Sequence, residues 1–280
     1  AAKLLGWQVH AVDGRGDPAE IQRVAAQVLE RRPQGVVLGG FDPQALGALI
    51  DDFKRQDIPL VGWHAGDRPG PTEALYSNIT SDPQQVADLA VEYAMRDGPI
   101  GVVIFTDSQF AIATAKTERM AERLAQCEQC RLLSIEDLPI SAVSKGMDER
   151  VRTLHRRFGN QWSHTLAIND VYFDHINVPL NALGRKDLRN ISAGDGSAKA
   201  LGRIHSGLSQ QVATVAEPLS VQGWQLVDEL NRAFAGTPSS QFVSAPLLIT
   251  PSVLQESDEL SIELDFSHEE AYLRLWRQMQ

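Results

Sequence analysis

The chain has 280 residues, which is long enough for two ordinary domains that each bury a core. A hydrophobic content of 43% and a charged content of 22% are typical of globular proteins, so the disordered and fibrous classes are excluded. The formal net charge is −10 and the basic residues are scattered, which excludes a nucleic-acid binder because such a protein needs a concentrated basic face.

The N-terminal residues do not form a signal peptide, because Ala1–Leu5 is too short and lacks a cleavage pattern. They are typical of the last turns of a helix closed by Gly6, and a strand over Gln8–Asp13 follows. The first strand of a doubly wound sheet usually lies in its middle, so a sheet that began at Gln8–Asp13 would leave backbone groups unpaired. We therefore expect about 25 further residues upstream, which carry one strand and most of one helix.

Short apolar strands recur along the chain and are separated by turn residues and amphipathic helices. Several strands are apolar throughout their middles, as is typical of parallel strands that are covered on both faces. The longest apolar runs remain strand-sized, well short of the roughly 18 residues that a membrane span requires. The predicted strands are Gln8–Asp13, Gly35–Gly40, Leu60–His64, Tyr76–Thr80, Ile100–Thr106, Leu132–Asp137, Thr165–Asp170, Ile191–Asp195 and Ala213–Glu217.

Three predicted helices follow an Asp-Pro step, which supplies a capping carboxylate and a proline at the first helical position. These helices are Ala19–Arg31, Gln44–Gln56 and Gln84–Arg96. Alternating strands and helices indicate an α/β protein with doubly wound parallel sheets.

The strands are too numerous for one such sheet, which favours two parallel-sheet lobes joined by a multi-strand hinge. The predicted crossovers between the lobes are Ser81–Pro83, Pro218 and Leu247–Pro251. The first lobe would then comprise residues 1–82 and 218–246, and the second lobe residues 83–217 and 247–280.

Several short motifs follow one another in a characteristic order. Each alone is weak, because Asp-Pro and Gly-Asp-Gly are common in turns. Together, in order and spacing, they resemble the type I periplasmic binding proteins of sugar ABC transporters, the ribose-binding protein group, over nearly the whole chain. The motifs are Gly14–Ala19, Gly35–Leu38, Asp42–Leu46, Asp57–Val61, Ile168–Asp170, Gly194–Gly196 and Ala213–Glu217.

This resemblance implies a set of ligand-binding residues. Asn169 matches a position that hydrogen-bonds sugar hydroxyls in the family, and Asp195 matches a carboxylate that accepts from them. Glu217 falls where the family often has Gln, and Lys116 matches an Arg that reaches the sugar.

The chain also departs from the ribose binders. It has His64-Ala65, preceded by Trp63, where they have an Asp-Arg pair, and it has Gly39 where they have Asn. The resemblance therefore does not extend to ribose as the ligand.

The residues at the strand ends support a polar ligand independently of the family. In open parallel sheets, ligands bind beyond the carboxyl ends of the strands, where helix N-termini present free N–H groups. Those positions supply carboxylates, an amide, an imidazole and aromatic rings, the mixture that a polyol needs. The predicted ligand-binding residues are Trp63, His64, Asp107, Gln109, Phe110, Lys116, Asn169, Asp195 and Glu217.

Each of these residues also has a purely structural interpretation. An aromatic such as Trp63 can be part of a core, and an exposed Lys is the default for Lys116 on a helix. Asp195 and Asn169 can serve only as turn or capping residues.

Cys127 and Cys130 form an isolated C-x-x-C motif. Zinc would require two further ligands, and a redox pair usually lies at the N-terminus of a helix rather than after its C-terminus. We expect a short structural disulfide, which suits an oxidising compartment, with two free thiols as the alternative. No metal site, cofactor site or catalytic motif is predicted elsewhere.

These observations predict a monomeric solute-binding receptor of an ABC importer, which closes on a carbohydrate or polyol in the periplasm and docks on a membrane permease. The protein would have no nucleic-acid partner, no cofactor and no enzymatic activity. Two alternatives share the fold: the effector-binding core of a LacI-type transcriptional regulator, and the sensor domain of a signalling receptor.

Overall fold

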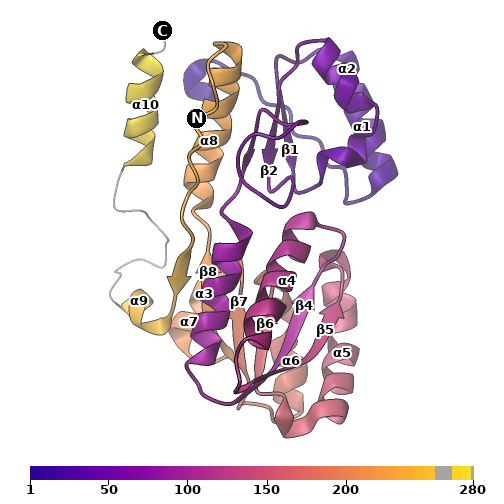
Figure 1. Cartoon of the computed structure of the whole chain (residues 1–280), viewed down its shortest axis with the longest axis vertical. Coiled ribbons are helices and arrows are strands. Elements are labelled where there is room, and N and C mark those ends of the chain that lie inside the picture. Colours follow the sequence, from indigo (N-terminus) through magenta and orange to yellow (C-terminus); the bar gives the residue numbers. More distant parts are fainter. Residues whose placement is uncertain (256–266, 279–280) are drawn as a thin grey trace.

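The computed structural model describes residues 1–255 and 267–278 and places them in two lobes, each built on its own sheet (Figure 1). The first-lobe sheet has three parallel strands in the order β1-β2-β3. The second-lobe sheet has the order β5-β4-β6-β7-β8-β9, in which only β9 is antiparallel to its neighbour. The strands are β1 (Val36–Gly39), β2 (Leu60–Trp63), β3 (Ser77–Ile79), β4 (Ile100–Thr106), β5 (Cys130–Asp137), β6 (His164–Ala167), β7 (Arg189–Ser192), β8 (Gln211–Ala216) and β9 (Leu247–Ile249).

Helices cover both sheets. The first lobe contains α1 (Pro18–Glu30), α2 (Leu49–Arg55) and α8 (Leu219–Phe234), of which α8 packs against β2 and β3. The remaining helices are α3 (Pro83–Met95), α4 (Ala111–Ala125), α5 (Val143–Phe158), α6 (Val171–Ala182), α7 (Ala198–Ser206), α9 (Pro251–Gln255) and α10 (His268–Gln278). Within the described residues, every helix is too short or too polar to cross a bilayer.

Local sequence explains where the helices begin. Asp17 accepts a hydrogen bond from the backbone N–H of Glu20 at 2.8 Å, and Pro18 occupies the first position of α1. Asp82 caps α3 in the same way through Gln84 N–H at 2.9 Å. A side-chain oxygen thus satisfies an N–H that has no partner within the helix.

The two lobes have separate hydrophobic cores of unequal size. The larger core lies in the second lobe, where all seven residues of β4 are buried. The smaller core lies in the first lobe around Leu38, Leu46 and Phe53. A central parallel strand that is covered on both faces must be apolar along its whole length, which is why Ile100–Thr106 could be predicted so accurately.

Between β3 and β9 the chain passes between the lobes three times. It leaves β3 of the first lobe for α3, which packs on the second sheet, and it returns from β8 to α8. It then passes from α8 back to β9 at the edge of the second sheet. The predicted α/β fold with two parallel-sheet lobes and a multi-strand hinge matches this arrangement.

The predicted strand Gln8–Asp13 is wrong. Residues 7–14 have no regular secondary structure, because no strand in the described part of the chain pairs with them. β1 forms one edge of the first sheet, and its Val37 is 43% exposed. The expectation of an upstream strand stays a prediction.

The predicted helix Gln44–Gln56 is interrupted. A short 3-10 helix covers Pro43–Leu46, and α2 begins only at Leu49. Gly47 lies between them with φ 56° and ψ −130°, a conformation that favours glycine and does not continue a helix.

The segment α10 lies on the first lobe rather than the second. We expected residues 247–280 to belong to the second lobe, but α10 packs against α8, and Figure 1 shows it beside that helix. The indole N–H of Trp276 donates to Asp228 of α8 at 2.7 Å, and its ring stacks on Trp224 with centroids 5.6 Å apart. Residues 256–266 and 279–280 of the predicted second lobe lie outside the described residues, and we propose that the lobe boundaries among the other residues are as predicted.

Candidate functional site

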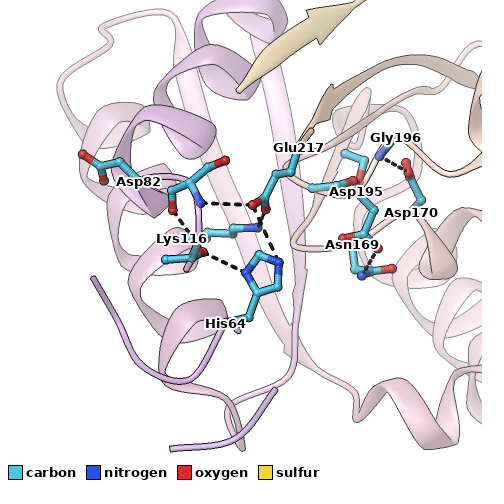
Figure 2. A network of polar contacts seen from close by, with 12 residues as sticks. His64, Asp82, Lys116, Asn169, Asp170, Asp195, Gly196 and Glu217 are labelled. Carbon is cyan, nitrogen blue, oxygen red and sulfur yellow. Dashed lines mark hydrogen bonds and ion pairs between the residues drawn. The ribbon is translucent and has the colours of Figure 1, made fainter. Parts of the chain in front are cut away.

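The carboxylate of Glu217 lies at the centre of a network that joins both lobes and the hinge. Glu217 directly follows β8, and its Oε1 accepts a hydrogen bond from Lys116 Nζ of α4 at 3.2 Å. Its Oε2 accepts from the backbone N–H of Ser81, in the first crossover, and from the amide of Gln222 on α8, each at 3.3 Å. Lys116 and Glu217 are both buried. Figure 2 shows these groups converging from separate elements.

His64 brings the first lobe into this network. It follows β2 with φ 51°, and its Nδ1 lies 2.8 Å from the hydroxyl of Thr80. Its Nε2 lies 3.8 Å from Glu217 Oε2. The ring of Trp63 lies 4.7 Å from the His64 ring, and its indole N–H donates to Gln222 at 3.0 Å, which fixes the indole in place.

Asn169 and Asp195 lie side by side at the ends of β6 and β7. Asn169 Oδ1 accepts from the backbone N–H of Val171, the first residue of α6, at 2.8 Å, while its Nδ2 donates to Asp195 Oδ2. Asp195 has φ 74°, which turns its side chain out of the strand direction. Both side chains are half-buried, as is expected for groups that can meet a ligand.

Asp170 holds the loop that carries Asp195. Its Oδ2 accepts from the backbone N–H groups of Gly196 and Ser197, each at 2.9 Å, and its Oδ1 accepts from Gln211 at 2.8 Å. Asp170 is buried and has all of these partners within the second lobe. It positions the loop rather than facing a ligand.

Gly194 allows the two groups of polar residues to approach each other. A Cβ at this position would lie 2.7 Å from the carbonyl oxygen of Ile168 and 3.0 Å from Lys116 Nζ. The ammonium group therefore lies against the backbone beside Asp195. Lys116 thus links the Glu217 network to the Asn169–Asp195 pair.

The surroundings shift the pKa values of Glu217 and Asp195 in opposite directions. Burial alone would raise the pKa of Glu217, but Lys116, His64 and the hydrogen bonds outweigh it and lower the pKa to about 2. Burial raises the pKa of Asp195 to about 6, opposed by Lys116 and reinforced by the charges of Asp170 and Glu217. Burial also lowers the pKa of His64, so this imidazole is neutral at pH 7.

Three predicted residues lie apart from this network. Asp107 is buried, and its oxygens accept from the backbone N–H of Gln109 at 3.2 Å and of Ile140 at 2.8 Å, so it fastens two loops. Gln109 is exposed, and Phe110 packs against the second-lobe core. Ligand contact by these three residues stays a prediction.

The sequence reasoning missed Ser81, Asp170 and Gln222. Ser81 acts through its backbone, so its residue type carried no signal. Gln222 lies in the first turns of α8, five residues after Glu217, and its importance depends on the two lobes meeting. Asp170 directly follows Asn169, and this adjacency to a predicted site residue was the one signal available.

Two shallow depressions in the surface lie elsewhere. One of about 360 Å³ is lined by Arg32, Pro33, Gln56 and Ile58. The other, of about 340 Å³, lies near Arg131, Gln161 and Ser163. Neither contains a predicted site residue, which is consistent with polar side chains of the two lobes contacting one another at the candidate site.

The two cysteines are joined by a disulfide between Cys127 and Cys130, whose Cα atoms are 5.2 Å apart. The bond links the end of α4 to the start of β5. Among residues 1–255 and 267–278, no cluster of His, Cys, Asp or Glu side chains is arranged to hold a metal ion.

Solved structures with the same fold are numerous, and three illustrate the likeness. An ABC transporter solute-binding protein from Agrobacterium vitis with bound allitol has a TM-score of 0.79 at 16% identity, covering 91% of this chain and 88% of that one. An ABC sugar transporter subunit from Rhodobacter sphaeroides has a TM-score of 0.75 at 20% identity, covering 89% of each chain. The myo-inositol-binding protein of Caulobacter has a TM-score of 0.77 at 16% identity, covering 91% of this chain and 87% of that one.

At these identities the likeness establishes the fold, that of type I periplasmic binding proteins. A comparison with curated protein sequences finds no significant relative. The family model for the periplasmic binding protein domain matches residues 1–238, which is most of the chain. The chain therefore belongs to the periplasmic binding protein domain family.

Proposed function

We propose that this protein is the solute-binding receptor of an ABC importer, which captures a sugar or sugar-like polar molecule in the periplasm and delivers it to a membrane permease. One observation carries the proposal: hydrogen-bonding groups from the first lobe, the second lobe and the hinge meet beyond the carboxyl ends of parallel strands. Solved structures of the same fold include proteins with bound allitol and myo-inositol, which supports a polyol ligand.

The site residues divide by lobe. Asn169, Asp195 and Lys116 belong to the second lobe and would hold hydroxyl groups by donation and acceptance. His64 and Trp63 belong to the first lobe and would complete the site by a hydrogen bond and by a flat apolar face against the C–H groups of the ligand. A ligand that bridges both sets stabilises the closed arrangement of the lobes, which is the form that a permease would recognise.

The network around Glu217 would form part of the hinge. Its carboxylate contacts the first crossover through Ser81 and the second lobe through Lys116, and Glu217 itself begins the second crossover. Lobe movement would therefore alter this network directly. Binding and release of a solute need no chemical change in it, so the protein would act as a receptor and not as an enzyme.

The test is a thermal-shift screen of sugars and polyols, followed by the substitution Asp195→Ala. We expect at least one compound to raise Tm of the wild type, and we expect Asp195→Ala to abolish that shift because it removes an acceptor of the site. The Tm without ligand should not fall, because the buried carboxylate of Asp195 costs stability at neutral pH. Asp51→Ala, at an exposed position on α2, serves as the matched control.

Two outcomes would contradict the proposal. One is the absence of any shift across the whole screen. The other is a ligand-induced shift in Asp195→Ala as large as in the wild type, which would place the binding site elsewhere.

A further inference from the structure

The single ammonium of the site is already neutralised within the protein. Lys116 Nζ lies 3.2 Å from Glu217 Oε1, and the side chains of this pair are only 6% and 1% exposed. The other oxygen of Glu217 receives N–H groups from Ser81 and Gln222. An isolated buried charge is costly, so Lys116 cannot leave Glu217 to neutralise an anionic ligand without a large penalty, although its ammonium can still donate a hydrogen bond to a neutral hydroxyl.

The carboxylate of Asp195, by contrast, forms no direct ion pair and feels the charge of Lys116 only as a neighbour. One of its oxygens accepts from the neutral amide of Asn169. Among the ion pairs of the described residues, none involves Asp195, and Lys199 and Arg203 of the following helix α7 pair instead with Asp174. Asp195 is half-buried, so the residue keeps part of its surface exposed to solvent.

The site therefore contains the carboxylates of Asp195 and Glu217 and one ammonium, and the buried carboxylate of Asp170 adds further negative charge beside Asp195. The neighbouring groups do not correct this imbalance, because His64 is held in a buried setting that favours its neutral form. A ligand with a carboxylate or phosphate would meet an excess of negative charge and find no free cation. A ligand with an ammonium group would compensate the charge of Asp195 through a charge-assisted hydrogen bond.

On the basis of the receptor function proposed above, we infer that the solute is a sugar or polyol that bears an amine, and that its ammonium group binds the carboxylate of Asp195. The Lys116–Glu217 pair then serves to exclude acidic sugars. The remaining hydroxyl groups of the solute are held by Asn169 and His64. Trp63 covers a face of the ring.

The experiment compares matched sets of ligands by calorimetry. Each set has one ring, such as glucose, galactose, mannose or inositol, carrying a hydroxyl, an amine or a carboxylate. In the set that binds most tightly, we expect the amine to bind at least about tenfold more tightly than the hydroxyl parent. The carboxylate member should bind more weakly than both.

Two substitutions assign the preference to the named groups. Asp195→Asn keeps the shape of the side chain and should reduce the ratio of amine to hydroxyl affinity to about one. Glu217→Gln leaves the charge of Lys116 uncompensated and should strengthen binding of the carboxylate member at least about tenfold. Circular dichroism and Tm without ligand verify that both variants are folded.

Each outcome decides one of two questions. If the hydroxyl parent or the carboxylate member of the best set binds more tightly than the amine in the wild type, the inference about the amine is wrong while the receptor function stands. An amine preference that persists in Asp195→Asn also overturns the assignment. If no member of any set binds, the receptor function itself is contradicted.

Discussion

His64 and Asp195 share an uncommon backbone conformation, with φ values of 51° and 74°. A residue with a side chain rarely adopts positive φ, and Asp and His tolerate it better than bulky residues do. His64 comes directly after β2 and Asp195 comes three residues after the end of β7, and in both cases the turn directs the side chain toward the polar network. The hydrogen bond from Asn169 to Asp195, and the contact of His64 with Thr80, hold the two side chains there.

Asp195 should make the protein less stable as the pH rises from 4 to 7. Its pKa is raised from 3.8 to about 6, so between these values the folded state holds a proton that the unfolded state has lost. The stability that this proton provides is therefore lost as the pH rises through 6. The amide of Asp195→Asn does not titrate. Between pH 4 and pH 7, the free energy of unfolding of this variant should therefore rise by up to about 3 kcal/mol relative to that of the wild type. Urea unfolding at pH 4, 5, 6 and 7 measures the difference.

Glu217 provides a control, because its contribution to stability depends on pH in the opposite direction to that of Asp195. Its pKa is lowered from 4.5 to about 2, so its contribution to stability is present above pH 4.5 and is lost as the pH falls toward 2. The cost of Glu217→Gln should therefore shrink at acid pH. Parallel curves for the wild type and Asp195→Asn would contradict the assignment of a raised pKa to Asp195.

Among the elements, α10 makes a specific test possible. Trp276 is 3% exposed, stacks on Trp224, contacts the ring of Tyr272 at a tilt, and donates to Asp228. Trp276→Ala should lower the free energy of unfolding by about 3 kcal/mol, because it removes a buried aromatic ring and a hydrogen bond to a buried carboxylate. Arg277→Ala, at an exposed position on the same helix, should change it by less than about 0.5 kcal/mol. Equal stabilities for the two variants would show that α10 does not pack on α8 in solution.

Sequence patterns predicted elements best where burial is complete. Ile100–Thr106 agrees residue for residue with β4. The strands predicted to end at Asp170 and Asp195 stop earlier, at Ala167 and Ser192, because the polar residues after them turn out of the sheet. A local pattern also cannot reveal whether a strand has a partner, and this explains the failure at Gln8–Asp13.

The residues of the candidate site, like the elements, could be predicted only in part from the sequence. The grouping of His64, Asn169, Asp195 and Glu217 follows from a rule about strand ends, whereas Lys116, on a helix, was expected only from the family resemblance. Contacts in the structure link these five residues. The roles of Ser81 and Gln222 depend on contacts between distant segments, and nothing in their local sequence encodes those contacts. The packing of α10 on α8 was hidden for the same reason.

For the whole molecule, the unequal cores predict unequal local stability. The second-lobe core contains several times as many buried apolar residues as that of the first lobe. We expect backbone amides of β4, β6 and β7 to exchange hydrogen at least about tenfold more slowly than those of β1 and β2 at pH 7. Native-state hydrogen exchange read by mass spectrometry measures this difference, with the chain unfolded in urea as the reference for intrinsic rates. Similar protection in both lobes would contradict the expectation.

The first lobe is made of segments that lie on either side of the second lobe in the chain. Its sheet is complete by residue 79, but the helix that covers β2 and β3 begins only at residue 219. During synthesis or export, an apolar face of the first sheet therefore stays uncovered until about 140 further residues have emerged. This takes some seconds at ordinary rates of translation. The edge strand β9 of the second lobe emerges later still, so neither lobe can complete its fold before most of the chain has been made.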